Sequence, residues 1–335
     1  MRIGIDAMGG DHAPAEEIKG ALAARDLLGS GDRLVLIGDE PAMRKCLDGT
    51  EDWQSIIEIR HAEEVIRMDD SPVEGLRSKP NSSIAIMVQM HRNKELDACI
   101  SAGNTGAIVA AAQMRLRRLQ GVHRPGIAIV TPTLHGPVAL CDVGANVNCR
   151  PQHLHQYGIM ASVYIEAICG IEKPRVALLS IGEEDGKGNE LVKRTRELMK
   201  NDPNLNFIGN LESRDLFGGT CDVLVCEGFV GNVVLKLMEG MAEGVIKALL
   251  GEIAAGMPDQ VGVIQSTGRD ILAKYDFNEY GGAPLLGVNG IFVICHGATN
   301  SRGIMNAVRV AADLVKRQVN QRIIKLLSHG QETLS

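Results

Sequence analysis

Short apolar runs alternate with longer amphipathic segments along the chain. Several runs are apolar at nearly every position, which is typical of strands buried on both faces of a sheet. The segments between them carry apolar residues at helical spacing. The expected strands are Arg2–Asp6, Arg33–Ile37, Ile56–Ile59, Asp97–Ile100, Gly126–Val130, Val138–Asp142, Val176–Ser180, Asn206–Ile208, Asp222–Cys226 and Ile291–Cys295. The expected helices are Ala15–Leu28, Ser82–Arg92, Gly106–Leu119, Gln152–Ile168, Glu190–Lys200, Val230–Ala254 and Arg302–Leu327.

This alternation of strand and helix predicts βαβ units and a mostly parallel sheet. No internal repeat or low-complexity linker interrupts the pattern, so we expect residues 1–335 to form a single α/β domain. Ligands of open parallel sheets bind beyond the carboxyl ends of the strands. The loops that directly follow strands are therefore the first candidates for a functional site.

Composition narrows the class of protein. The charged share of 23% is ordinary for a globular chain, and the aromatic share of 3% predicts an aliphatic core. The chain has 38 glycines in 335 residues, above the usual share of about 7%, which indicates many tight turns. The formal net charge of −6 argues against a nucleic-acid partner, because such proteins need a basic face.

The cysteines and the first residues of the chain bear on its compartment. None of the eight cysteines forms a CxxC pair, and Cys149, His153 and His155 lack zinc-site spacing, so we expect no disulfide framework and no metal. The chain opens directly on a strand pattern, and no apolar run approaches the roughly 18 residues of a membrane span. These features predict a cytoplasmic protein.

A glycine-rich loop follows the first predicted strand. Asp6 ends that strand, Gly9 and Gly10 permit a sharp turn, and Pro14 suits the first turn of a helix. Such a turn can direct backbone N–H groups at an anion. An ordinary turn, capped by Asp11, is the alternative interpretation.

A second loop, Ser101–Ala107, follows the strand Asp97–Ile100. Ser101, Asn104 and Thr105 offer two hydroxyls and an amide where a helix begins. Backbone donors and the helix dipole favour a phosphate there. The pattern predicts a phosphate cradle in preference to a plain capping loop.

Two further loops follow strands in the middle of the chain. Asn146 lies in Asp142–Asn146 and could orient a substrate or adopt a left-handed turn. The loop Ser180–Glu190 contains Lys187 and Asn189, but its glycine spacing departs from that of a P-loop, so a nucleotide site is disfavoured. Lys187 is a candidate anion contact, and a solvated charged loop is the alternative.

The last two loops lie in the C-terminal half. Asn232 and Lys236 are one helical turn apart after the strand that ends at Cys226, so an amide and an ammonium can face one ligand. His296 ends a strand and precedes Asn300 and a helix, a suitable place for a hydrogen-bond donor or acid/base group. A structural histidine is the alternative.

Taken in order, these segments resemble the phosphate acyltransferases of bacterial phospholipid synthesis. The resemblance runs from Ile3 to about Leu327, although the family usually has Asp at the positions of Glu227 and Asn148. The segments that carry it are IDAMGGDHAP from Ile3, SAGNTGA from Ser101, RPGIA from Arg124, DVGAN from Asp142, SIGEEDGKGNE from Ser180, NFIGNLESRD from Asn206, EGFVGNVVLK from Glu227 and GGAPLLGV from Gly281.

The resemblance implies a Rossmann-like three-layer fold, related to isocitrate and isopropylmalate dehydrogenases and to phosphate acetyltransferases. It implies a homodimer without a cofactor that transfers a fatty acyl group from acyl carrier protein to inorganic phosphate. The acyl phosphate would pass to a membrane-bound glycerol-3-phosphate acyltransferase. The candidate catalytic residues are Lys187, Asn232, Lys236 and His296. The candidate substrate-binding residues are Asp6, Gly9, Gly10, Ser101, Asn104, Thr105, Asn146, Asn189 and Asn300.

Simple chemistry fits these residue types. A thioester is already activated and phosphate is a nucleophile, so orientation and charge stabilisation suffice without a covalent intermediate. We expect Ser101, Asn104 and Thr105 to bind phosphate together with Lys187 or Lys236. Asn232 or His296 would contact the thioester carbonyl. Acetyl transfer from coenzyme A is the alternative within enzymes, followed by a metal- and NAD-dependent dehydrogenase; a non-catalytic subunit that binds acyl carrier protein is the alternative outside them.

Acyl carrier proteins are acidic, so a local basic face is expected. One candidate group is Arg115, Arg117, Arg118, His123 and Arg124, and the other is Arg309, Lys316, Arg317, Arg322 and Lys325. A solvated face is the alternative for either. The apolar stripe of Val230–Ala254 predicts core or dimer packing. Its far end, residues 240–257, has Lys247 as its only base, so we expect peripheral contact with the inner membrane face less than dimer packing.

Overall fold

The computed structural model describes residues 1–274 and 277–333. Residues 275–276 and 334–335 of the expected 1–335 domain lie outside the described residues. Eleven strands of the described residues form one sheet. The strands are β1 (Arg2–Asp6), β2 (Arg33–Gly38), β3 (Ile57–His61), β4 (Ala98–Ser101), β5 (Gly126–Thr133), β6 (Gly136–Cys141), β7 (Arg175–Leu179), β8 (Asn206–Leu211), β9 (Val223–Val225), β10 (Ala283–Leu286) and β11 (Phe292–Ile294). The α-helices are α1 (Ala15–Ala23), α2 (Glu40–Leu47), α3 (Pro72–Ser78), α4 (Ser83–Arg92), α5 (Thr105–Arg115), α6 (Pro151–Cys169), α7 (Glu190–Lys200), α8 (Gly228–Gly256), α9 (Val261–Lys274), α10 (Ser301–Lys316) and α11 (Val319–Thr333).

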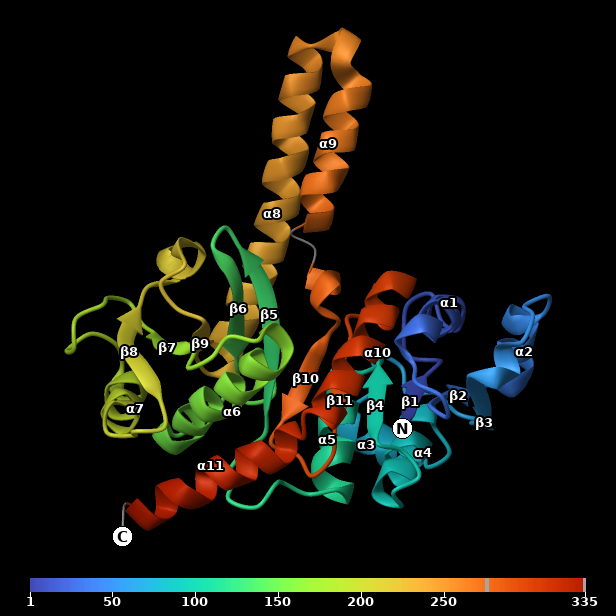
Figure 1. The fold of residues 1–335 in the computed structure, drawn as a ribbon, viewed down its shortest axis with the longest axis horizontal. Coiled ribbons are helices and arrows are strands. Elements are labelled where there is room, and N and C mark those ends of the chain that lie inside the picture. The colour runs from blue at the N-terminus through green and yellow to red at the C-terminus, as the bar shows by residue number, and fades with distance from the viewer. Residues whose placement is uncertain (275–276, 334–335) are drawn as a thin grey trace.

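The strands follow the order β3-β2-β1-β4-β11-β10-β5-β6-β9-β7-β8 (Figure 1). Neighbours run parallel from β3 to β11 and again from β6 to β8. Between these groups, β10 pairs antiparallel with β11 and with β5, and β5 pairs antiparallel with β6. The prediction of a mostly parallel sheet is confirmed, and the antiparallel strands join its two parallel parts.

Alternate residues of strands such as β2 and β7 face two separate hydrophobic clusters. Leu34 and Leu36 of β2 belong to one cluster, and Val35 and Ile37 to the other. Side chains of α1, α6 and α10 complete the first cluster, whereas α4 and α5 complete the second. Helices therefore cover both faces of the sheet and give three layers.

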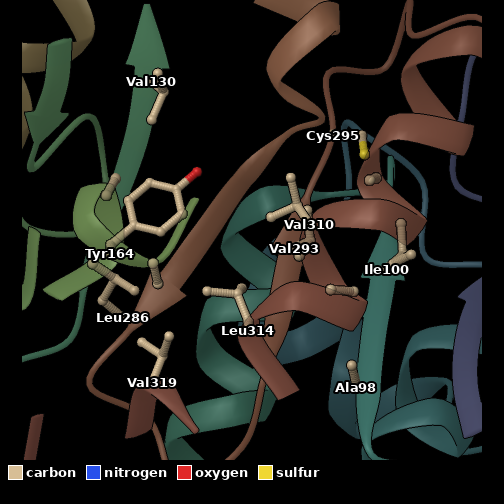
Figure 2. Close-up of a cluster of buried hydrophobic side chains, with 14 of the residues drawn as sticks. Ala98, Ile100, Val130, Tyr164, Leu286, Val293, Cys295, Val310, Leu314 and Val319 are labelled. Atoms are coloured by element: carbon tan, nitrogen blue, oxygen red, sulfur yellow. The ribbon is translucent and has the colours of Figure 1, made fainter. Parts of the chain in front are cut away.

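Figure 2 shows the first cluster where it crosses the centre of the sheet. Val310 and Leu314 of α10 and Tyr164 of α6 lie beside side chains of the strands, among them Val293 of β11 and Ile100 of β4. Most of these side chains are aliphatic, as the low aromatic content predicts. Burial of each contributes about 1.5–3 kcal/mol to folding.

The apolar stripe of α8 differs from the prediction that it lies in the core. Helices α8 and α9 form a hairpin that projects away from the sheet (Figure 1). Val233, Leu237 and Val245 on α8 are 50%, 58% and 57% exposed in the single chain. The core interpretation holds for Val234 and Met238, which pack against the second cluster, and is wrong for the exposed residues of the stripe. Helical periodicity reveals an apolar face but not what covers it. Packing of this face in a dimer stays a prediction.

Other elements differ from the sequence pattern for local reasons. The expected helix Arg302–Leu327 is two helices, because Gln318 adopts a left-handed φ of 51° between α10 and α11. Strand β10 is not predicted, since it has four residues and contains Pro284. Helices α2, α3 and α9 are not predicted either. Among the described residues, none of the helices combines the length and the apolarity that a membrane crossing requires.

Candidate functional site

A cleft of about 830 Å³ opens where the two parts of the sheet meet. Loops and helices that follow strands of both parts line it, as the strand-end argument predicts. The cleft brings together four residues that the sequence singled out, namely Thr105, Asn232, Lys236 and His296. Its apolar walls include Val109 of α5 and Leu235 of α8.

The N-terminus of α5 forms one wall of the cleft. Gly103, Thr105 and Gly106 line the cavity there, where the first N–H groups of the helix have no intrahelical partner. Asn104 precedes the helix, and its Oδ1 accepts a hydrogen bond from Ala107 N–H at 2.9 Å. This end of α5 offers backbone donors, a hydroxyl and the positive end of the helix dipole to an anion.

The amide of Asn104 is engaged elsewhere. Its Nδ2 donates to the carbonyls of Arg67 and Asp70, both at 3.0 Å, and to that of Met68 at 3.3 Å. Asn104 therefore fixes the segment before α3 against the start of α5. Its side chain does not line the cleft, so its contribution to the site is to hold these two segments together.

The first glycine-rich loop supports the second. Ser101 Oγ donates to the buried carboxylate of Asp6 at 2.6 Å and accepts from Gly103 N–H at 3.0 Å. A Cβ on Gly9 would lie 2.5 Å from the nitrogen of Gly103, so only glycine allows the two loops to touch. Burial raises the pKa of Asp6, against hydrogen bonds that lower it. Asp6, Gly9 and Ser101 thus lie behind the cleft.

A second buried carboxyl lies beneath Gly10. Glu17 of α1 is 1% exposed, and its Oε2 has no hydrogen-bond partner. A Cβ on Gly10 would lie 2.2 Å from Glu17 Oε1. Burial, assisted by the charge of Asp6, raises the pKa of Glu17 to about 7. Gly10 therefore packs directly against the Glu17 carboxyl, whose pKa is near neutrality.

Helix α8 supplies the opposite wall. Glu227 caps it by accepting from Phe229 N–H at 2.7 Å and Val230 N–H at 3.0 Å, so this glutamate supports the helix start. Asn232 and Lys236 face the cleft one turn apart, and Glu239 follows them. Burial raises the pKa of Glu239, while the nearby charges of His296 and Lys236 oppose that rise.

His296 completes this group from the loop after β11. Its Nδ1 accepts a hydrogen bond from Ala298 N–H at 3.2 Å. The ring then carries its proton on Nε2, which can donate to a bound oxygen. Neither Glu239 nor Asp11, which also lines the cleft, is predicted as a site residue. The available signal for Glu239 is its position three residues after Lys236 on one helix face.

The remaining predicted residues do not line the cleft. Asn189 and Asn300 cap α7 and α10, each accepting at 3.0 Å from the backbone of Val192 and Gly303. Asn146 Nδ2 donates to the carbonyl of Pro125 at 2.6 Å and so anchors its own loop. Lys187 is exposed in the loop after β7, and β7 is the neighbour of the edge strand β8. These positions favour Lys236 over Lys187 as the cation of the cleft.

Asp142 holds a third wall in place. Its Oδ1 accepts from Ile127, Gly144 and Ala145 N–H groups at 2.9, 3.1 and 3.0 Å. Its Oδ2 accepts from Asn146 N–H at 2.8 Å. Burial raises the pKa of Asp142, and these hydrogen bonds lower it. Ile127, Gly144 and Ala145 all line the cleft, so Asp142 sets their geometry.

No group of three or more His, Cys, Asp or Glu side chains converges as metal ligands within the part of the chain that the structure describes. Of the three residues considered for zinc, His155 bonds Asp202 at 2.7 Å. Cys149 Sγ donates to the carbonyl of Asn146 at 3.5 Å. These two side chains therefore have separate partners.

Comparison with known proteins places this geometry in a family. Residues 1–322 match the model of a family described as fatty acid synthesis protein. A phosphate acyltransferase of Dictyoglomus turgidum is 44% identical over 331 residues, which cover 98% of each chain. The chain belongs to the phosphate acyltransferase family. Another member, from Geobacter sulfurreducens, is 45% identical over 96% of this chain and 93% of its own.

Solved structures agree on the fold. A phosphotransacetylase from Streptococcus pyogenes matches with a TM-score of 0.63 at 14% identity, covering 94% of both chains. A branched-chain phosphotransacylase from Enterococcus faecalis matches at 0.59 and 13% identity, covering 94% of this chain and 99% of its own. A Salmonella typhimurium structure assigned to a 4-hydroxythreonine-4-phosphate dehydrogenase matches at 0.52 and 14% identity, covering 93% and 99%. The expected relation to acyl-phosphate enzymes and dehydrogenases is confirmed at the level of fold.

Proposed function

We propose that this member of the phosphate acyltransferase family transfers a fatty acyl group from acyl carrier protein to inorganic phosphate. The observation that carries the proposal is the convergence of Thr105, Lys236, Asn232 and His296 on one cleft. The cleft combines an anion-binding helix end with the ammonium of Lys236 and the side-chain donors of Asn232 and His296. Its apolar walls suit an acyl chain beside a polar reaction centre.

The proposed reaction needs no covalent enzyme intermediate. An oxygen of hydrogen phosphate attacks the thioester carbonyl carbon and the carbon–sulfur bond breaks. The sulfur takes up the proton that the phosphate gives up and leaves as the thiol. The protein's task is to bring phosphate and thioester together and to stabilise the negative charge that develops on the carbonyl oxygen. The residues that the cleft brings together can perform both tasks.

The phosphate subsite lies at the start of α5 in this proposal. Backbone N–H groups of Thr105 and Gly106 and the Thr105 hydroxyl would donate to phosphate oxygens. The ammonium of Lys236, from the opposite wall, would offset the phosphate charge. The carboxylate of Glu239 would attract the same ammonium. It would thereby help to position Lys236, although it would also reduce the positive charge that the phosphate meets.

The carbonyl subsite lies between α8 and the loop after β11. Asn232 Nδ2 and His296 Nε2 are the side-chain donors that line the cleft there. Removal of one donor to such an oxyanion typically costs 10²–10³-fold in kcat. Bound phosphate lies toward α5 in this arrangement. Its oxygen would therefore attack the carbonyl carbon from the side of α5, while the two donors contact the carbonyl oxygen from the opposite wall.

The proposal also includes a homodimer, a membrane contact and an enzyme that receives the acyl phosphate. The exposed apolar stripe of α8 supports a homodimer in which the stripe is covered. Peripheral membrane contact through residues 240–257, which approach the far end of the hairpin, stays a prediction. So does delivery of acyl phosphate to a membrane-bound glycerol-3-phosphate acyltransferase in the same cytoplasm.

The experiment that tests the proposal compares acyl donors. We expect phosphate-dependent release of free thiol from a long-chain acyl carrier protein at a higher kcat/KM than from acyl-coenzyme A. Release from short acyl-coenzyme A alone would favour an acetyltransferase-like activity. Binding of acyl carrier protein without any thiol release would indicate a non-catalytic binding subunit.

A further inference from the structure

A second cavity, of about 1070 Å³, adjoins the candidate active site and is strongly basic. Four arginines and two histidines line it, and no Asp or Glu is among its lining residues. We call it the arginine cavity. Its lining residues are Gln113, Arg117, Arg118, His123, Arg124, Asn148, Cys149, Arg150, Gln152 and His153.

The positive charge of this cavity is not balanced locally. Among residues 1–274 and 277–333, Arg117, Arg124 and Arg150 form no salt bridge, although the whole chain is acidic. The pKa of His153 is lowered, first by burial and then by the charges of neighbouring arginines and His123. The cavity is therefore a site of concentrated positive potential.

The backbone around the cavity is held in place. Gln156 of α6 accepts from His123 N–H and donates to the carbonyl of Gly121, both at 2.8 Å. Arg118 donates to the carbonyl of His123. Arg150 is the N-cap residue of α6 and lines the cavity. The N-terminus of α6 therefore adds the positive end of its helix dipole to the cavity. The backbone that carries these charges is thus arranged before any ligand binds.

One residue connects the arginine cavity to the cleft. Gln113, on α5, lines both cavities. Thr105 lies at the start of the same helix in the cleft, and eight residues of α-helix rise about 12 Å. A ligand that lies along α5 can therefore have one end at the arginine cavity and the other at the candidate reaction centre.

We propose that the arginine cavity binds the phosphate of the acyl donor's phosphopantetheine arm. The proposal rests on the proposed function, because an acyl carrier protein holds its thioester at the end of such an arm. Guanidinium groups bind phosphate oxygens through paired hydrogen bonds. With the phosphate held there, the arm follows α5 past Gln113 and presents its thioester in the cleft.

The other basic groups fit this role less well. Arg115 of the first predicted group donates to the carbonyl of Ala85 at 2.7 Å and does not line the cavity. In the C-terminal group, Arg322 pairs with Glu166 at 2.8 Å, and Arg309 donates to the carbonyl of Glu279 at 2.6 Å. In contrast, Arg117, Arg118, His123 and Arg124 of the first group line the cavity that adjoins the cleft.

The test uses two acyl donors that differ only in phosphate, acyl-phosphopantetheine and acyl-pantetheine. The double variant Arg117→Gln, Arg124→Gln changes two side chains that form no salt bridge with any of the described residues. We expect the ratio of kcat/KM for acyl-phosphopantetheine to that for acyl-pantetheine to fall about tenfold or more. The charge-matched control Lys45→Gln, Lys200→Gln, on α2 and α7, should keep the wild-type ratio.

A milder variant guards against misfolding. Gln152→Glu is nearly isosteric and adds one carboxylate to the arginine cavity. It should lower the same ratio several-fold. A fall in turnover that is equal for both donors would overturn the proposal, because it would indicate a structural defect. A raised KM for inorganic phosphate with an unchanged donor ratio would also overturn it and would assign the cavity to the free anion.

Direct binding separates this proposal from the proposed function. In calorimetric titrations, wild type should bind phosphopantetheine more tightly than pantetheine, and the double variant should lose that difference. This result would stand even if no acyl phosphate were formed. Equal affinities of wild type for the two probes would overturn the proposal while leaving thiol release from acyl carrier protein intact.

Discussion

The buried carboxyl of Glu17 predicts a specific dependence of stability on pH. Its pKa is about 7 in the folded chain against an ordinary value of 4.5. The folded state therefore binds a proton that the unfolded state has lost across this range. The contribution of Glu17 to stability is fully present below pH 4.5 and falls as the pH rises toward 7.

The magnitude follows from these two values. Between pH 5.5 and 8, the linkage relation gives a loss of about 2 kcal/mol from Glu17 alone. Glu17→Gln removes the titration, so the variant should lose less stability than wild type over the same range. For a chain of this size the difference amounts to about 3 °C in Tm.

The assay is thermal unfolding at several pH values with wild type, Glu17→Gln and a control. Glu51→Gln changes the charge equally at an exposed position. Only the slope of Tm against pH is predicted, since the amide NH2 that replaces Oε2 has no acceptor there and changes stability independently of the titration. Equal slopes for wild type and Glu17→Gln would refute the assignment of a raised pKa to this residue.

Three further predictions follow from the site and the hairpin. Lys236→Ala should raise the KM for phosphate at least tenfold in steady-state assays, because it removes the cation of the cleft; an unchanged KM would exclude this role. Asp142→Ala should lower the free energy of unfolding by about 2–4 kcal/mol in urea titrations, since four backbone N–H groups lose their acceptor; a change below about 1 kcal/mol would contradict the accounting. Leu237→Lys and Val245→Lys should each shift sedimentation toward monomer, because they place charge in the exposed stripe of α8; sedimentation identical to wild type would argue against that interface.

The sequence predicts the sheet well because strands buried on both faces are marked by continuous apolar runs. It does not predict β10, whose four residues lie among glycines. Burial is also mispredicted for the exposed part of the α8 stripe, because periodicity is the same for a core helix and for the exposed face of a hairpin. The antiparallel junction of β10 with β5 depends on pairing between distant segments, which no local pattern records.

The candidate site is predicted in part. Motif position finds Thr105, Asn232, Lys236 and His296, because each follows a strand at the edge where loops converge. The same rule selects Asn189 and Asn300, which the structure places as helix caps. Asparagine at a helix start has the same local signature whether it caps the helix or binds a ligand. Only the tertiary arrangement separates the two cases, and it also reveals Glu239.

The most direct test of the central claim is formation of acyl phosphate from inorganic phosphate and a long-chain acyl carrier protein, followed by ³¹P NMR. We expect a new acyl phosphate resonance to appear with wild type, in step with thiol release, and to be strongly reduced with Lys236→Ala. Thiol release without that resonance would mean that water, and not phosphate, accepts the acyl group, and it would contradict the proposed function.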